Sequence, residues 1–321
     1  MRANVLARNP LAGAFLSEYF VLLLTVILFV ALAPFAVGLA SSESALNIVA
    51  YLIPLFIAGT GLTIVLITGG IDLSIPAVIA LTSVVGARLM TGESSVISVA
   101  VGVGAMLGVG AAIGAFNGVL ITALRLPAFM VTLASMLFFN GFAVWFTQSS
   151  NIGDLPANYL ALGKQLPIAL TAAVVIGVVF HLLLSRTIFG RWIYALGQNA
   201  VAAHISGVPV QRLTFATYVL SGFCAAIASV ILTGRLETGS PVLGREMLLD
   251  VVGATVLGGT SLFGGRGRIY WTFFGVLFLT VLDTALNLMN LSQFAVTMSK
   301  GAVILFAAVI DATRRRFVAF A

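Results

Sequence analysis

Charged residues are scarce in this sequence. They make up 8% of its 321 residues, against about 25% in an ordinary globular domain, whereas hydrophobic residues make up 60% and the mean hydropathy is +1.15. This composition excludes a soluble globular chain and predicts an all-α polytopic membrane protein. The net charge of +6 does not indicate a nucleic-acid partner, because the basic residues lie mainly in short loops between apolar runs.

Side chains that carry out covalent or metal chemistry are also rare. Cys224 is the single cysteine, so no disulfide can form within the chain, and its apolar surroundings favour a packing role. His181 and His204 lie in different segments and provide neither a metal cluster nor a nucleophile–base pair. No stretch fits the phosphate-binding pattern G-x-x-x-x-G-K followed by Ser or Thr. We therefore expect no metal, no cofactor and no enzymatic activity, and a membrane enzyme is disfavoured.

Apolar sequence, by contrast, is abundant and comes in long blocks. A helix needs about 20 apolar residues to cross a bilayer, and ten blocks come close to this length. They cover residues 19–40, 46–68, 72–90, 96–123, 128–147, 167–186, 212–233, 246–263, 269–290 and 294–311. Arg2 and Arg8 before the first block resemble the start of a signal peptide, but the block is long enough to cross, so we expect an uncleaved span.

Basic residues are unequally distributed between the loops on the two sides of these spans. With the N-terminus in the cytoplasm, eleven fall inside and four fall outside. The inner ones are Arg2, Arg8, Arg125, Arg186, Arg191, Arg212, Arg266, Arg268, Arg314, Arg315 and Arg316; the outer ones are Arg88, Lys164, Arg235 and Arg245. This excess predicts that both termini are cytoplasmic.

Two stretches of the chain resemble one another. Residues 68–76, TGGIDLSIP, and 233–241, TGRLETGSP, share Thr-Gly, an aliphatic residue, an acid and Pro in register. The span count places the first inside and the second outside, which is the pattern of an inverted repeat beside a transport pathway. We expect one transmembrane domain over residues 1–321, in which spans two to five (46–147) are repeated as spans seven to ten (212–311).

Few polar side chains lie inside the predicted spans. A charge in hydrocarbon costs roughly 2.5 to 3.5 kcal/mol, so these side chains should face a cavity, a partner or the interface. Candidates for a translocation pathway are Asp72, Ser74, Asn117, Asn140 and Asn287. Asp72 is also placed to cap the third span, and Asp283 can neutralise Lys300 across neighbouring spans.

The longest polar interruption is the segment 190–212, GRWIYALGQNAVAAHISGVPVQR. Asn199 can cap a short helix here, which Gly207 and Pro209 would end. Flanking arginines place the segment in the cytoplasm. A helix with small side chains held between spans is suited to docking another protein; a plain loop with a helical turn is the alternative.

Glycines form two patterns. Gly102, Gly104, Gly108, Gly110 and Gly114 are spaced for close approach of helices. Gly258, Gly259, Gly264, Gly265 and Gly267 follow the end of a span and predict a tight turn at the cytoplasmic surface, because no strand precedes them as in a dinucleotide-binding loop.

Several motifs together resemble the ribose-type permeases of bacterial ABC sugar importers. They are GGIDLS at 69–74, FNG at 116–118 with PAFMVTL at 127–133, ALGQNAVAAHISGV at 195–208, and VLGGTSLFGGRG at 256–267. The resemblance covers nearly the whole chain. It implies a ten-span subunit of the type II importer architecture, similar to the cobalamin-importer permeases, which lies in the bacterial inner membrane. It further implies pairing as a dimer, with ATPase subunits inside and a solute-binding protein outside.

The resemblance also assigns sites. The ATPase-coupling residues would be Ala195, Gly197, Asn199, Ala202, Ala203, Ser206 and Gly207. On the outer side, we hypothesise that charged residues receive the binding protein, namely Arg88, Glu93, Arg235, Glu237, Arg245 and Glu246. The implied function is ATP-driven import of a monosaccharide. Import of nucleosides or branched-chain amino acids stays open, as does ion-coupled secondary transport through Asp72, Asp283 or Lys300.

Three positions depart from the family pattern. Leu248-Leu249-Asp250 stands where Glu-Leu-Asp is usual, Asn140-Gly141 where Arg-Gly is common, and Asp283-Thr284-Ala285 where Asn-Asn-Gly is usual. These departures leave open which sugar is moved and whether two identical or two different permeases pair.

Overall fold

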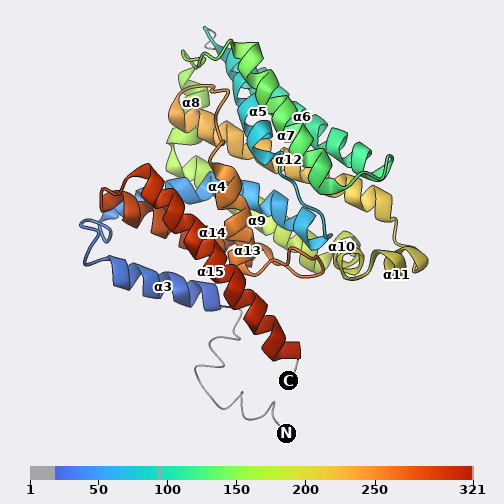
Figure 1. Ribbon diagram of the computed structural model, residues 1–321. Helices are drawn as coiled ribbons and strands as arrows, with labels where there is room; N and C mark the ends of the chain where they lie inside the picture. The colour runs from blue at the N-terminus through green and yellow to red at the C-terminus, as the bar shows by residue number, and fades with distance from the viewer. Residues whose placement is uncertain (1–18, 93–94, 320–321) are drawn as a thin grey trace.

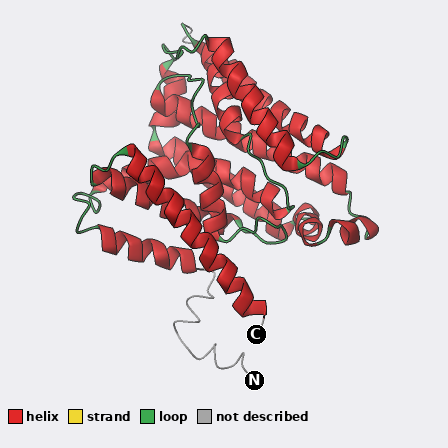
Figure 2. Cartoon of the chain, in the orientation of Figure 1, coloured by secondary structure: helices red, strands yellow, loops and turns green. Residues whose placement is uncertain are grey.

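The computed structural model describes residues 19–92 and 95–319, and every regular element within them is a helix (Figures 1 and 2). The helices are α3 (Phe20–Leu32), α4 (Ser42–Ile67), α5 (Ile75–Met90), α6 (Val96–Thr122), α7 (Ala128–Thr147), α8 (Ala157–Lys164), α9 (Leu166–Arg186), α10 (Ile188–Gln198), α11 (Ala200–Ile205), α12 (Val210–Leu236), α13 (Met247–Gly258), α14 (Ile269–Leu288) and α15 (Gln293–Ala319). The predicted all-α class is confirmed.

Each of the ten predicted spans coincides with a helix, but the helices differ in length. Six of the described helices are long and apolar enough to cross a membrane: α4, α6, α7, α9, α12 and α14. Shorter apolar helices are α3, α5, α13 and the part of α15 up to Phe306. The predicted spans 19–40 and 246–263 were too long. Helix α3 ends before Pro34, which lacks an N–H, and α13 ends before Gly259, whose φ of 114° is left-handed.

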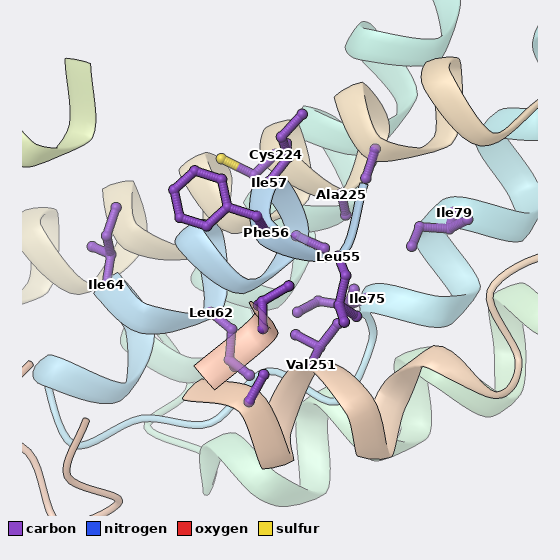
Figure 3. Close-up of a cluster of buried hydrophobic side chains, with 14 of the residues drawn as sticks. Leu55, Phe56, Ile57, Leu62, Ile64, Ile75, Ile79, Cys224, Ala225 and Val251 are labelled. Atoms are coloured by element: carbon purple, nitrogen blue, oxygen red, sulfur yellow. The ribbon is translucent and has the colours of Figure 1, made fainter. Parts of the chain in front are cut away.

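Helices α4 and α12 form the centre of the bundle. In α4, 18 of 26 residues are buried, and its neighbours are α9, α12, α13 and α14. Figure 3 shows α4 residues such as Phe56 and Leu62 packed among side chains of α5, α12 and α13. Cys224 of α12 lies in this cluster, buried beside Gly61, as a packing residue.

Part of the predicted glycine pattern lies at a close helix crossing. A Cβ added at Gly110 or Gly114 of α6 would overlap with backbone atoms of α12, at Gly222 and Tyr218 respectively. Gly102 faces the side chain of Met90 instead, and Gly104 and Gly108 have no neighbouring atom within 4 Å. The prediction of close approach therefore holds for Gly110 and Gly114.

Helix contacts in the two predicted repeats correspond to one another. Helix α5 packs against α6 and α7, and α13 packs against α14 and α15. Across the halves, α12 contacts α5 and α6, whereas α4 contacts α13 and α14. The aligned motifs are not placed identically, because Thr68 follows α4 while Thr233 lies inside α12.

Loops predicted for the two sides gather at two ends of the bundle. At one end, the Gly265 N–H donates to the Ile67 carbonyl at 2.8 Å and the Tyr194 hydroxyl to the Gly267 carbonyl at 2.7 Å. At the other, Ile152 and Gly239 exchange two backbone hydrogen bonds of 2.8 Å. Helix α4 connects these ends, and its 26 residues span about 39 Å. Arg2 and Arg8 lie outside the described residues, as do the side chains of Arg314, Arg315 and Arg316.

Candidate functional site

A buried polar network surrounds the segment that leads into α5. One carboxylate oxygen of Asp72 accepts hydrogen bonds from the N–H and the hydroxyl of Ser74, at 2.9 and 2.6 Å. The other accepts from the hydroxyl of Ser221 on α12, at 2.7 Å. Asp72 is 1% exposed. A carboxylate this deep is stable only when donors surround it, and here three donors do.

The network continues into α6 and α7. The side-chain amide of Asn117 donates to the Ser74 hydroxyl at 2.9 Å, and the Ser135 hydroxyl donates to the amide oxygen of Asn117. The Ile71 carbonyl accepts from Thr132 of α7 and Tyr218 of α12, both at 3.3 Å. Residues from α6, α7 and α12 thus fix residues 71–74 and, with them, the start of α5.

Asp72 does not cap α5, which corrects the prediction. The residue before α5 is Ser74, and no side chain caps this helix. Pro76 stands at the second helical position and has no N–H, so a donor that a capping carboxylate would use is absent. The Asp72 carboxylate turns instead to Ser74 and Ser221.

Of the five predicted pathway residues, the structure brings three together. Asp72, Ser74 and Asn117 share the buried network. Asn140 is partly buried on α7, and Asn287 is exposed near the end of α14, where its side chain donates to the Asp283 carbonyl at 2.8 Å. Sequence reasoning missed Ser135 and Ser221, because a small hydroxyl residue in an apolar helix is common and gives no local sign of a distant partner.

An ion cluster joins the last three helices. Lys300 of α15 lies 2.8 Å from a carboxylate oxygen of Asp283 on α14, which confirms the predicted pair. It also lies 3.1 Å from Asp250 on α13, which had not been assigned to the pair. The side chains are 17 to 31% exposed, so the cluster is partly open to its surroundings.

The predicted helix of the central segment is present as α11, joined to α10 at Asn199. The Asn199 side chain accepts from the Ala202 N–H at 3.0 Å, which confirms the predicted cap. The helix ends before Gly207, whose φ is 84°. Val201 and Ile205 are 70% and 80% exposed, one helical turn apart, and Ala202, Ser206 and Gly207 are exposed beside them. This apolar projection, formed by residues 200–207, is called the α11 knob below.

The inner part of the same segment is packed rather than exposed. Ala203 is buried, and Ala195 and Gly197 are partly buried. A Cβ at Gly197 would overlap with the Ile67 carbonyl oxygen and crowd the Gly265 nitrogen at 2.5 Å. Gly197 therefore lets α10 touch both the turn after α4 and the glycine-rich loop after α13. Burial raises the pKa of Tyr194, so its hydroxyl stays protonated and holds Gly267 of that loop.

Charged residues predicted to receive a binding protein differ in their surroundings. Arg88, Arg245 and Glu246 are exposed. Glu237 forms an ion pair with Lys164 at 2.7 Å, and the Arg235 guanidinium lies 4.1 Å from the centre of the Tyr51 ring. Glu93 lies outside the described residues. Glu246 accepts a hydrogen bond from Gln293 at 3.2 Å, so partners within the chain already engage Glu237, Arg235 and Glu246.

Known proteins resemble this chain over most of its length. A family model described as "Branched-chain amino acid transport system / permease component" matches residues 44–308. The ribose import permease protein of Bacillus subtilis (strain 168) is 39% identical over 258 residues, covering 78% of this chain and 79% of the relative. The L-arabinose transport system permease protein of Escherichia coli (strain K12) is 33% identical over 310 residues, covering 95% and 93%. No solved structure matches.

Proposed function

The chain belongs to the family described as the permease component of branched-chain amino acid transport systems, and we propose that the solute it moves is a monosaccharide. It is the membrane-spanning permease subunit of a ribose-type ABC importer, a multi-pass inner-membrane protein and not an enzyme. ATP hydrolysis belongs to a separate subunit. A monosaccharide is favoured over a branched-chain amino acid because permeases named for ribose and L-arabinose are 33 to 39% identical to this chain.

The α11 knob is the observation that carries the mechanism. It projects exposed apolar and small side chains, and α10 connects it through Gly197 to the segments beside α5 and α13. An ATPase subunit that holds the knob can therefore move α10 against the segment that leads into α5 and the loop that follows α13. Ala195, Gly197, Asn199, Ala202, Ala203, Ser206 and Gly207 are the proposed coupling residues. Asn199, Ala202, Ser206 and Gly207 would meet the ATPase, whereas Ala195, Gly197 and Ala203 would transmit its movement.

The ten-span, type II importer-like architecture is likewise proposed. The corresponding helix contacts of α4–α7 and α12–α15 favour an inverted repeat over residues 46–147 and 212–311, with the coupling segment 190–212 between them. Short helices that follow non-helical segments, as α5 and α13 do, are a feature of transport pathways. The four shorter helices would complete the ten crossings.

We propose that α5 and α13 border the pathway. Asp72, Ser74 and Asn117 act there by fixing the start of α5, because their polar groups are already paired and buried. Asn140 and Asn287 retain exposed surface and can meet the solute or the second permease subunit. The dimer would form with either an identical or a related chain.

Orientation follows from the basic residues. The end formed by α10, α11 and the glycine-rich loop would face the cytoplasm together with both termini, and the end near Ile152 and Gly239 would face the binding protein. Cysteines introduced at Ser42 and Val201 test this, since only the former should react with an impermeant maleimide in intact cells. At the outer end, exposed Arg245 is the strongest docking candidate, and Arg245→Glu should slow uptake most at low salt.

Transport in reconstituted vesicles tests the function. Vesicles that contain this permease and its ATPase, with ATP on the ATPase side and the loaded binding protein on the other, should accumulate labelled ribose or arabinose. Vesicles given only a proton or sodium gradient should accumulate nothing. ATP-driven uptake of leucine or a nucleoside would refute the proposed monosaccharide substrate but support the ATP-driven mechanism. Uptake driven by a gradient alone would refute an ATP-driven importer.

A further inference from the structure

A cavity of about 750 Å³ lies where the end of α9, the start of α14 and the side of α10 meet. Arg191, Arg266 and Arg268 line it, and none of its lining residues is acidic. Two of these arginines come from the glycine-rich loop and the third from α10. The chain therefore brings three cations from two segments around one concave space.

Aromatic rings form part of the same wall. The Arg268 guanidinium lies 5.1 Å from the Trp271 ring centre and 5.6 Å from that of Tyr270. Tyr194 is held by its hydrogen bond to Gly267. The Arg268 guanidinium also donates to the Tyr270 hydroxyl. Arg191 and Arg266 are therefore the lining residues whose guanidinium N–H groups are proposed to meet a ligand, and phosphate oxygens are the acceptors that match guanidinium geometry best.

The cavity opens beside a surface suited to lipid chains. The end of α9 contributes His181, Leu184 and Ser185 to the lining. Along the same helix, towards its start, lie exposed apolar side chains: Val174, Val175, Val178, Val179 and Leu182. Tyrosine and tryptophan are typical of the level at which lipid headgroups begin. A molecule with a phosphate at one end and hydrocarbon at the other would contact the arginines and this apolar surface together.

We infer that the cavity binds the phosphodiester headgroup of an anionic membrane lipid, with the acyl chains lying along α9. Basic pockets between membrane helices on the cytoplasmic side are suited to such headgroups, because anionic lipid is concentrated there. The assignment to the cytoplasmic leaflet rests on the orientation proposed above. A lipid bound here would touch α10, and it would thereby stabilise the same helix that connects the α11 knob to α5 and α13.

Lipid retention by the purified full-length permease tests the site. The Arg191→Gln/Arg266→Gln double variant is compared with Arg125→Gln/Arg212→Gln, which removes two exposed arginines predicted for the same face but outside the cavity. Each protein is incubated with micelles containing phosphatidylglycerol or phosphatidylcholine, and bound lipid is counted by mass spectrometry of the intact protein. The cavity variant should retain phosphatidylglycerol about tenfold less than wild type and the control, because it loses two charge-assisted contacts.

Several outcomes would overturn the inference. Equal retention of phosphatidylglycerol by the cavity variant, the two single variants and the control would do so. So would wild-type binding of inorganic phosphate alone at the same concentration, since the ligand would then be a free anion. If lipid retention is unchanged but the ATPase no longer co-purifies with the cavity variant, the arginines contact protein instead. Retention is measured without transport, so failure here leaves the proposed importer function untouched.

Discussion

Helices α5 and α13 occupy corresponding places in the two halves of the chain, but they are held in different ways. In α5, 13 of 16 residues are buried, and in α13 only 6 of 12 are, so α13 keeps the larger free face. Hydrogen bonds join α12 to α5 as far as Ser83: besides those near Asp72, Ser229 donates to the Ile79 carbonyl at 2.8 Å and Thr233 bonds Ser83 at 2.7 Å. Helix α13 is held instead through the partly exposed cluster of Asp250, Asp283 and Lys300.

This difference indicates which half is fixed and which can rearrange. A fully buried hydrogen-bond network loses all its partners at once when it opens, and no water replaces them. A partly exposed ion cluster is screened and can exchange partners at lower cost. We therefore expect α5 to stay with α12 during transport, and α13 to be the helix whose position changes or whose free face meets the second subunit.

The largest effect on the folded permease should come from Asp72→Leu. It leaves the Ser74 N–H and the hydroxyls of Ser74 and Ser221 without their acceptor, and each buried unsatisfied group costs about 1–3 kcal/mol. Thermal unfolding in detergent, followed by size-exclusion chromatography, should show a clear loss of stability. Asp72→Asn keeps one oxygen acceptor and should lose less. If Asp72→Leu is as stable as wild type, the network does not hold α5.

Gly197→Ala should have the next largest effect, because it pushes α10 away from the end of α4 and from the glycine-rich loop. The added Cβ overlaps with the Ile67 carbonyl, and overpacking of this kind costs about 1–3 kcal/mol. We expect lower stability and less transport per ATP hydrolysed. Gly104→Ala, where nothing lies within 4 Å, is the matched control and should behave as wild type. Normal coupling in Gly197→Ala would argue against α10 as the connection between the α11 knob and the movement of α13.

Lys300→Met should destabilise the permease less than Asp72→Leu, which tests the comparison directly. It leaves two carboxylates near one another, but both are partly exposed. We therefore expect the free energy of unfolding to fall by about 1–2 kcal/mol, which lies between the losses typical of exposed and of buried ion pairs. Adding Asp250→Asn and Asp283→Asn to Lys300→Met should restore stability by removing the repulsion. A loss larger than that of Asp72→Leu would reverse the assignment of the fixed and the movable half.

Ala202→Arg should leave stability nearly unchanged and abolish transport. Ala202 is exposed on the α11 knob, so an arginine there enters solvent in the free permease but clashes with a bound ATPase. Co-purification with the ATPase and uptake into vesicles measure the effect. Gln211→Arg adds the same charge at an exposed position of α12 and should retain both activities. Wild-type uptake by Ala202→Arg would argue against the knob as the docking site.

Local patterns in the sequence predicted local structure well. Asn199 and Gly207 bound the α11 helix as expected, because a cap and a helix stop depend on residues within one turn. The spans were found because each apolar block must satisfy its backbone within one helix. Their ends at Pro34 and Gly259 were missed, since apolar residues continue beyond the point where the backbone turns.

Long-range partners could not be predicted in the same way. Asp283 and Lys300 were paired because their spans are neighbours in the chain, but the role of Asp250 depends on how α13 folds back. Asp72 and Ser221 are 149 residues apart, and no periodicity connects them. The prediction that Asp72 caps α5 was wrong for this reason. The helix that follows Asp72 can be predicted from the adjacent sequence, but the hydrogen bond from the Ser221 hydroxyl of α12 cannot.

The contact at Gly197 has a practical consequence for engineering. Helix α10 meets residue 67 and residue 265 through main-chain atoms at Gly197, and its Tyr194 hydroxyl donates to the Gly267 carbonyl. The segment 188–207 should therefore be exchangeable with that of another permease, provided that Gly197, Tyr194 and the buried Ile193 and Leu196 are kept. A chimaera of this kind would work with the donor's ATPase and still transport its own solute, so the ATPase and the transported solute of the importer could be chosen separately.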